Sequence, residues 1–336
     1  MGTPLLDIQN LHIDFHTDDG VVHAVNGLDL YLEKGETLGI VGETGAGKTT
    51  TALAIMGLID CPPGRMSADR MNFAEKNLLE LKEDEYLRIR GKEISMIFQD
   101  PMTALNPVLP ILDQIGEAIR NHQKCSTSEA VDRAIEMLKV VRIPPERAGE
   151  YPHQFSGGMK QRVVIAMALA CNPSLLIADE PTTALDVTIQ AQVLEMMKGL
   201  KEEFNTSMIM ITHDLGIVAE ICDRVAVMYA GEILEYGTLR EVFKNTSHPY
   251  TIGLFGAIPN LDEDVEFLYQ IDGLMPDPTD LPAGCPFCTR CKYAQEICFR
   301  EKPEKKELAG DNHYVRCHIY HGRMGIESVG RGDKNG

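Results

Sequence analysis

The segment GETGAGKT, Gly42 to Thr49, carries the residues best suited to hold a phosphate group. It fits the pattern G-x-x-x-x-G-K-[ST] and stands between the apolar run TLGIV and the helix-forming stretch KTTTALAIMGL, the context that this pattern requires. Its glycines let backbone N–H groups curl around phosphate oxygens, and the following helix adds its positive end. Lys48 would neutralise phosphate charge, and the Thr49 hydroxyl would bind Mg²⁺. The expected phosphate-binding residues are Gly42, Glu43, Thr44, Gly45, Ala46, Gly47, Lys48, Thr49 and Thr50.

The pair Asp179-Glu180 supplies carboxylates that could complete such a site. Asp179 ends the apolar run LLIAD, so a buried strand would bring it to the Mg²⁺ ion. Glu180 follows at once, where it could orient or deprotonate an attacking water molecule. The chain contains no Asn-Lys-x-Asp segment, the type of segment that reads guanine, so the nucleotide is expected to be ATP.

A third candidate site is the cysteine-rich stretch CPFCTRCKYAQEIC, Cys285 to Cys298, which Cys317 follows. In a reducing compartment, clustered cysteines favour metal or redox chemistry over structural disulfides. The overlapping C-x2-C pairs suit zinc. Unligated thiols, a zinc site and an iron–sulfur cluster all remain open from the residues alone.

The composition limits the classes of partner. The chain has 336 residues and a formal net charge of −18, which argues against a nucleic-acid partner because such proteins normally present a basic face. The N-terminus has neither the basic region nor the apolar region of a signal peptide. The most apolar stretch, VVIAMALACNPSLLIA, is short for a membrane span and is interrupted by Asn172-Pro173. We therefore expect a cytosolic protein without a membrane segment of its own.

Short apolar runs that alternate with helical patterns predict the fold class. The runs TLGIV, ISMIF, LLIAD and SMIMIT have the length of strands, and Ile189, Val193, Met196 and Leu200 share one helical face. This alternation indicates an α/β fold with a mostly parallel sheet covered on both sides. Leu28, Leu30 and Leu32 alternate with polar residues and predict a half-buried strand near the start. RVAVMYAGEILEYG predicts a closing hairpin that turns at Ala230-Gly231.

Changes in composition suggest two domains. Residues 1–245 hold the nucleotide motifs, and a helical subdomain is expected as an insertion at about residues 100–158. Residues 246–336 turn to proline, glycine and cysteine without strong periodicity, which predicts a small Cys-rich C-terminal domain.

The segment FSGGMKQRVVIAMAL resembles the signature sequence of ABC-type ATPases, with Phe155 and Met159 in place of the usual Leu and Gln. It lies between the glycine-rich loop and the Asp179-Glu180 pair, as it does in that family. FQDP with Gln99, TALD with Asp186 and ITHD with His213 resemble three further motifs of the family. The resemblance implies a P-loop NTPase core with antiparallel N-terminal strands and the inserted helical subdomain.

The resemblance also implies roles for these residues. Two such domains pair head-to-tail, so Ser156, Gly157 and Gly158 would bind the partner's ATP. Glu180, His213 and Gln99 would be catalytic, and Thr49, Gln99 and Asp179 would hold Mg²⁺. Asp186 would lie at the dimer contact near the nucleotide, and Phe15 would stack on adenine.

FQDPMTALNP and SHPYTIGLFGAIP resemble segments of the oligopeptide and dipeptide importer ATPases, as does the tail LPAGCPF…RC…C. This implies a peripheral subunit on the cytoplasmic face of the membrane, which powers peptide import together with a second ATPase subunit, two membrane permeases and an extracytoplasmic peptide-binding protein. The dipeptide-type subunit is the first expectation, and nickel or glutathione import is the alternative. A non-transport ABC ATPase in DNA repair or translation is a further alternative, and a regulatory switch that does not hydrolyse ATP is disfavoured by intact Asp179 and Glu180.

Tails of these importer ATPases share a C-x5-C-x6-C pattern with a distant fourth cysteine. The resemblance implies a 4Fe-4S cluster held by Cys285, Cys291, Cys298 and Cys317, with Zn²⁺ as the alternative. Cys288 lies where the pattern needs no cysteine. Because ATP hydrolysis needs no redox step, the cluster is expected to be a structural clip for a small domain.

Overall fold

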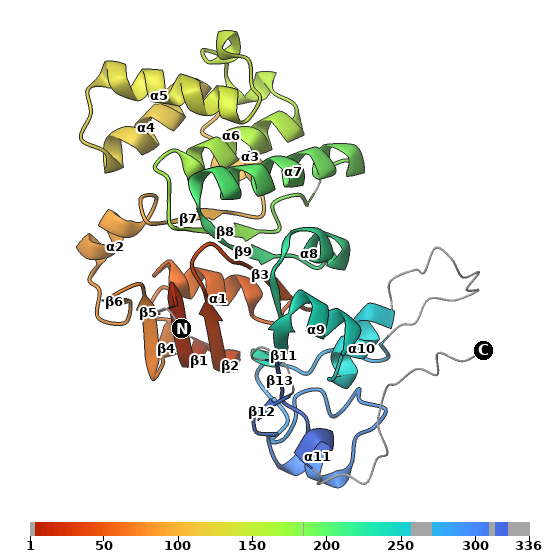
Figure 1. The fold of residues 1–336 in the computed structure, drawn as a ribbon. Helices are drawn as coiled ribbons and strands as arrows, with labels where there is room; N and C mark the ends of the chain where they lie inside the picture. The colour runs from red at the N-terminus through yellow and green to blue at the C-terminus, as the bar shows by residue number, and fades with distance from the viewer. Residues whose placement is uncertain (1–3, 184, 257–270, 309–312, 322–336) are drawn as a thin grey trace, which may run out of the picture.

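The predicted apolar runs form four neighbouring strands of one mixed sheet, from β3 to the edge strand β7 (Figure 1). The computed structural model describes residues 4–183, 185–256, 271–308 and 313–321, and all structural statements refer to these. Neighbouring strands from β10 to β7 run parallel, as expected for strands separated by helices. In spatial order the eight strands of this sheet are β12 (Lys306–Glu307), β13 (Tyr314–Val315), β11 (Glu232–Thr238), β10 (Arg224–Tyr229), β3 (Thr37–Val41), β9 (Ser207–Ile211), β8 (Leu175–Asp179) and β7 (Ile94–Ile97).

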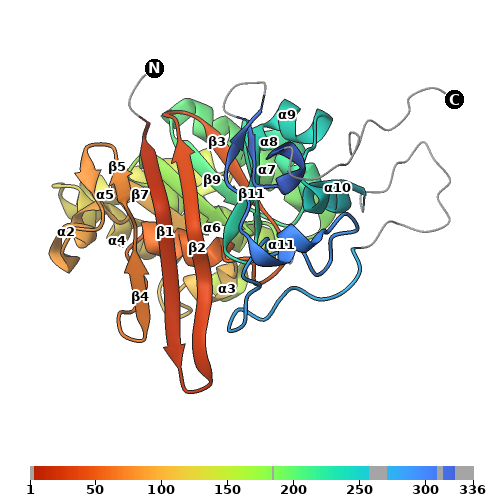
Figure 2. The same cartoon turned by 90° about the horizontal axis from the view of Figure 1, so that it is seen from below.

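A second, antiparallel sheet lies beside the first and is dominated by one long hairpin (Figure 2). The predicted strand at Leu28, Leu30 and Leu32 belongs to this hairpin, and its three leucines are buried. The sheet consists of β1 (Leu6–Thr17), β2 (Gly20–Leu32), β4 (Gly64–Ser67), β5 (Arg70–Phe73) and β6 (Lys76–Asn77).

The main sheet separates two apolar cores because successive side chains of a strand point to opposite faces. On β9, Met208 and Met210 join the core that holds α6 (Gly157–Leu169), whereas Ile209 and Ile211 join the core that holds α1 (Lys48–Ile55) and the long hairpin. Burial on both faces explains why the strands are continuously apolar. The α/β class with mixed sheets is confirmed.

Helices occupy most of the chain between β7 and β8 and form one end of the molecule (Figure 1). The sequence folds this way locally because Ser126 and Glu129 form a capping box at the start of one helix, and apolar residues such as Ile115 and Ile119 recur on one face of another. These helices are α3 (Pro101–Ala104), α4 (Ile111–His122), α5 (Thr127–Val140), η1 (Pro145–Arg147), η2 (Pro152–Gln154) and α6. The other helices before β10 are α2 (Glu83–Ile89), α7 (Val187–Phe204) and α8 (Leu215–Ile221).

The hairpin of β10 and β11 turns at Ala230-Gly231, where both residues have positive φ, as predicted. Beyond it the chain adds α9 (Leu239–Lys244), α10 (Pro249–Gly256), α11 (Glu296–Arg300) and η3 (His318–His321).

The Cys-rich segment packs against the main sheet. β13 pairs with β11, and Phe287 packs its ring against Tyr229 at 5.3 Å between centroids. Cys285, Cys288 and Cys298 belong to the same apolar core as α6. A separate C-terminal domain that begins at residue 246 stays a prediction, and residues 257–270, 309–312 and 322–336 of that range lie outside the described residues. Among the described residues, no helix has both the length and the apolar character to span a membrane.

Candidate active site and cysteine cavity

The glycine-rich loop joins β3 to α1 in a conformation that only glycine accommodates at two positions. Gly42 and Gly47 have φ of 155° and 98°. A Cβ atom on Gly42 would lie 2.1 Å from the Met228 carbonyl oxygen, and one on Gly47 would lie 2.4 Å from the Ala24 carbonyl oxygen. The loop is therefore pressed against β10 and β2, and these two glycines are required by close backbone approach.

Lys48 is buried at the first turn of α1 and is held by the loop itself. Its Nζ donates hydrogen bonds to the carbonyl oxygens of Gly42 at 2.8 Å and Glu43 at 2.9 Å. Burial lowers the pKa of Lys48, and the nearby carboxylates of Glu180 and Asp179 act in the opposite direction. An ammonium group has three N–H donors, so one remains to face a phosphate.

Thr49 and Asp179 meet as a Mg²⁺ site would require. Asp179 is the last residue of β8 and is only 3% exposed, and the Thr49 side chain hydrogen-bonds to it. Burial raises the pKa of Asp179 above its ordinary value, and the Thr49 bond offsets part of this. A buried carboxylate beside a hydroxyl is an oxygen-rich donor set, which is the chemistry that Mg²⁺ prefers.

Glu180 lies at the centre of a network that connects the ends of three parallel strands. Gln99 Nε2 donates to its carboxylate at 2.9 Å, Thr183 Oγ1 donates at 3.0 Å, and His213 Nδ1 lies 3.1 Å away. Burial by itself would raise the pKa of Glu180, but the bonds from His213 and Thr183 outweigh it, and the pKa lies below its ordinary value. Glu180 also has a φ of 47°, an unusual value for this residue type.

A cleft of about 400 Å³ opens over these groups. The predicted residues Thr44, Gly45, Gly47, Lys48, Thr49, Thr50, Gln99, Glu180 and His213 line it.

The cleft also has walls that the sequence analysis missed. Val22, Ala24 and Pro278 line it, whereas the predicted adenine-stacking residue Phe15 does not. Phe15 faces Val22 across the β1–β2 hairpin, and an added Cβ on Gly64 would lie 3.4 Å from the Phe15 ring. The pairing within the hairpin could have suggested Val22, but no sequence signal pointed to Pro278.

The signature motif lies outside this cleft. Ser156 is the N-cap residue of α6, and both Ser156 and Gly157 are exposed, while Gly158 is half-buried against Ile189 of α7. Asp186 occupies the N-cap position of α7 without a side-chain capping hydrogen bond and is also exposed, and Ala184 of the same motif lies outside the described residues. The chain's own cleft therefore does not include these residues.

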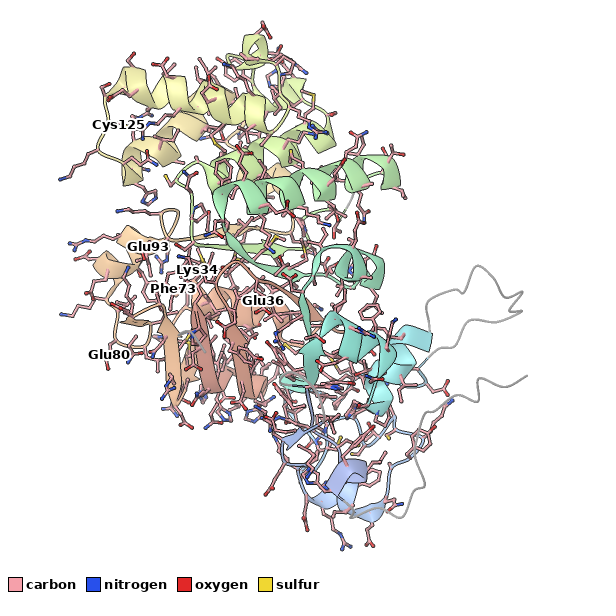
Figure 3. The ribbon with its side chains drawn as sticks, viewed as in Figure 1. Lys34, Glu36, Phe73, Glu80, Glu93 and Cys125 are labelled. Carbon is pink, nitrogen blue, oxygen red and sulfur yellow. The ribbon has the colours of Figure 1, made fainter. Side chains whose placement is uncertain are left out.

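The five C-terminal cysteines line one small enclosed cavity together with His248 and His318. All five are free thiols. Burial raises the pKa of Cys285 well above its ordinary value and that of Cys317 to about 12. Among the described residues, no three His, Cys, Asp or Glu side chains already converge as a metal-holding group. The scattered cysteines do not join this cavity, and Figure 3 shows Cys125 at the opposite end of the molecule, between α4 and α5.

His248 contributes an unpaired donor to the cysteine cavity. It is 1% exposed, and burial lowers its pKa to about 3, so the ring is neutral. The backbone N–H of Tyr250 donates to Nδ1 at 3.0 Å, which places the ring proton on Nε2. That Nε2 atom is buried without a hydrogen-bond partner in the described part of the chain.

The fold and the cleft together define an ABC-type ATPase. The family model described as "ABC transporter" matches residues 25–183. A solved ATP-binding cassette, described as a dimer in a post-hydrolysis state bound to ADP and Pi, is 30% identical with a TM-score of 0.61 and covers 70% of this chain and 99% of that one. CbiO1 from Clostridium perfringens, part of an ABC transporter complex, is 27% identical with a TM-score of 0.61 and covers 75% of this chain and 96% of that one.

More particular relatives cover nearly the whole chain. The oligopeptide transport ATP-binding protein OppD of Bacillus subtilis is 52% identical over 95% of this chain and 90% of its own length. The dipeptide transport ATP-binding protein DppD of the same organism is 51% identical over 93% of this chain and 94% of its own length. A second family model, "Oligopeptide/dipeptide transporter, C-terminal region", matches residues 234–298. The chain belongs to the family of oligopeptide and dipeptide transport ATP-binding proteins, and the resemblance inferred from its motifs is confirmed.

Proposed function

We propose that this ATPase powers the import of dipeptides and oligopeptides through separate membrane permease subunits. The observation that carries the proposal is the match of residues 234–298 to the C-terminal region of peptide transporters, because this region lies outside residues 25–183, which match the general ABC transporter model. The names of the similar relatives favour peptides over nickel or glutathione. The absence of nucleic acid among the partners stays a prediction that rests on the acidic composition.

Within one chain, the geometry supports the following division of labour. Lys48 and the loop N–H groups would bind the β- and γ-phosphates, and Thr49, Asp179 and Gln99 would hold Mg²⁺. The ion, when bound, supplies charge neutralisation at the phosphates. Glu180 accepts a proton from the attacking water, or orients it, and His213 and Gln99 keep the Glu180 carboxylate in place.

We further propose that two ATPase subunits close head-to-tail over the nucleotides. Ser156, Gly157 and Asp186 are exposed and outside the chain's own cleft, and Val187 beside them is an apolar residue that is 83% exposed. A partner surface that covers Val187 would explain this exposure. The similar solved cassette is described as dimeric, which supports this arrangement.

The helical subdomain is proposed to contact the permease. Gln99 leads directly from Glu180 into α3, so a change at the γ-phosphate can reach this subdomain. Phe98 and Val108 precede and follow α3 in the sequence and are 44% and 74% exposed, so both apolar side chains are available to a partner surface. A peripheral position on the cytoplasmic face of the membrane, and an extracytoplasmic binding protein beyond the permease, follow from this proposal.

For the cysteine cavity we propose a 4Fe-4S cluster held by Cys285, Cys291, Cys298 and Cys317, with zinc as the alternative. The proposal is supported by the cavity that these thiols line, with Cys285, Cys298 and Cys317 buried and Cys291 half-buried, and by the unpaired Nε2–H of His248 beside them. The cluster would cross-link three parts of the chain: the segment that holds Cys285 and Cys291, α11 with Cys298, and Cys317 directly before η3. Cys288 also lines the cavity, so the choice of four among five thiols needs a direct test.

Peptide uptake in the source cell tests the proposed function. Deletion of the gene in a strain without a redundant system should abolish uptake of labelled di- and oligopeptides and leave amino-acid uptake intact. The wild-type gene should restore uptake. A gene that encodes the Glu180→Gln variant should not restore it, because the variant protein is present but hydrolyses ATP too slowly. Unchanged peptide uptake after deletion would contradict the assignment.

A further inference from the structure

Residues 271–290, which we call the C-terminal strap, lie beside the nucleotide cleft. The backbone N–H of His23 on β2 donates to the carbonyl oxygen of Pro278 at 2.9 Å, and Pro278 lines the cleft. An added Cβ on Gly45 of the phosphate loop would lie 2.8 Å from Met275 Cε. The strap thus lies directly against the phosphate loop and the hairpin that together enclose the nucleotide site.

Arg290, at the end of the strap, binds the phosphate loop with a charge pair. Its Nη1 lies 3.0 Å and 2.9 Å from the two carboxylate oxygens of Glu43. Its side chain is only 5% exposed, whereas that of Glu43 is 32% exposed. A pair with one buried partner is less screened by water than an ordinary surface pair, so it constrains the loop more strongly.

The same guanidinium group also forms hydrogen bonds with the start of the strap and with β10. Nε donates to the Asp272 carbonyl oxygen at 3.0 Å, and Nη2 donates to the Ile271 carbonyl oxygen at 3.3 Å. Nη1 also lies 3.2 Å from the hydroxyl of Tyr229. One planar group therefore connects the start of the strap, its end and the phosphate loop, which a lysine could not do with the same geometry.

Glu43 is held from a second side by the C-terminal part of the chain. Its backbone N–H donates to the hydroxyl of Tyr250 on α10 at 3.0 Å. Its carbonyl oxygen, in turn, accepts from Lys48 at 2.9 Å. The conformation of Glu43 therefore determines where the Lys48 ammonium group lies.

We propose that Arg290 is a positioning residue for nucleotide binding: through Glu43 it holds the phosphate loop in the conformation that receives ATP. The loop has several residues with positive φ and needs external contacts to stay in one conformation. The contacts are made by protein groups alone, so the inference does not depend on a cluster in the cysteine cavity or on the transported substrate.

Binding of ATP to the purified full chain without Mg²⁺, where no hydrolysis occurs, tests the proposal by titration calorimetry. Arg290→Met should raise the Kd for ATP by about tenfold, which corresponds to about 1.4 kcal/mol. Glu43→Gln should raise it by a similar factor. The double variant should be no worse than Arg290→Met alone, because the two residues act as one unit. Arg300→Met is the matched control, since Arg300 is an exposed arginine of the same region and, among the described residues, forms a salt bridge with Glu296 in α11.

Thermal unfolding of each variant distinguishes positioning from stability. A lower unfolding midpoint with an unchanged Kd for ATP in Arg290→Met would make the contact merely structural and would overturn the proposal. Independent effects, in which the double variant shows the sum of the two free-energy changes, would also overturn it. If Arg290→Met does not fold, Glu43→Gln carries the test, and a wild-type Kd in that variant contradicts the proposal.

Discussion

The side-chain amide of Gln99 donates a hydrogen bond to the carboxylate of Glu180 over 2.9 Å, although the residues lie 81 positions apart. Gln99 follows β7 and Glu180 follows β8, and these strands are parallel neighbours in the sheet. Their carboxyl ends therefore meet at one edge, where His213 arrives after β9. The contact connects Glu180, the proposed general base, with Gln99, from which the chain leads into the helical subdomain.

Replacement of Glu180 by Gln should separate ATP binding from ATP hydrolysis. The amide retains hydrogen bonding but cannot accept a proton, so the rate of hydrolysis should fall at least ~100-fold, a typical loss for a general base. ATP affinity should stay near that of the wild type, and a closed ATP-bound dimer should accumulate. Turnover and gel-filtration measurements check this, with Glu195→Gln on the exposed face of α7 as the control. Near wild-type turnover would remove Glu180 from the catalytic role.

The signature motif should act on the partner's nucleotide. Ser156→Arg places a bulky charge at the exposed N-terminus of α6, outside the chain's own cleft. The isolated variant should therefore bind ATP with wild-type affinity, while hydrolysis fails in the assembled dimer at the site that this motif faces. Ser128→Arg, an exposed substitution on α5, should leave both properties unchanged. A large loss of ATP affinity in the isolated Ser156→Arg chain would mean that the motif acts within its own subunit.

Gly47 should tolerate no side chain. Its φ of 98° strains any other residue, and a Cβ atom would lie 2.4 Å from the Ala24 carbonyl oxygen. Gly47→Ala should weaken ATP binding by at least about tenfold, since left-handed backbone alone costs roughly 1–2 kcal/mol per residue. Gly149→Ala is the matched control because nothing lies within 4 Å of its Cβ position. Equal ATP affinity in both variants would show that the loop adapts more than the structure indicates.

The cysteine cavity should hold iron in anaerobically purified protein. The protein should be brown, absorb broadly at about 400 nm and contain about four irons per chain if four thiolates bind one cubane. Cys291→Ser should abolish the colour, whereas Cys125→Ser, far away between α4 and α5, should retain it. Cys288→Ser reports whether the fifth thiol is needed. Colourless protein with one zinc and no iron would assign the site to zinc instead.

Much of the fold and of the phosphate site was predictable because it is encoded locally. Runs such as TLGIV and LLIAD are strands buried on both faces, so their apolar character alone reveals them. The glycines at 42 and 47 mark backbone that no other residue adopts easily. Because parallel strands deliver their carboxyl ends to one edge, Asp179, Glu180 and His213 could be expected near the glycine-rich loop.

Only the tertiary structure decided which distant segments complete the site. Arg290 and Glu43 are 247 positions apart, and neither belongs to a repeating pattern that would relate them. Val22 and Pro278 line the cleft and Phe15 does not, and Pro278 reaches it because the strap returns to β2, where the backbone N–H of His23 donates to the Pro278 carbonyl oxygen. The spacing of the cysteines suggested a metal site, but their gathering around His248 depends on contacts with α10 and η3 that local sequence does not encode. Long-range contacts of this kind follow from the packing of whole elements, whereas strand periodicity and loop glycines follow from the backbone of a few neighbouring residues.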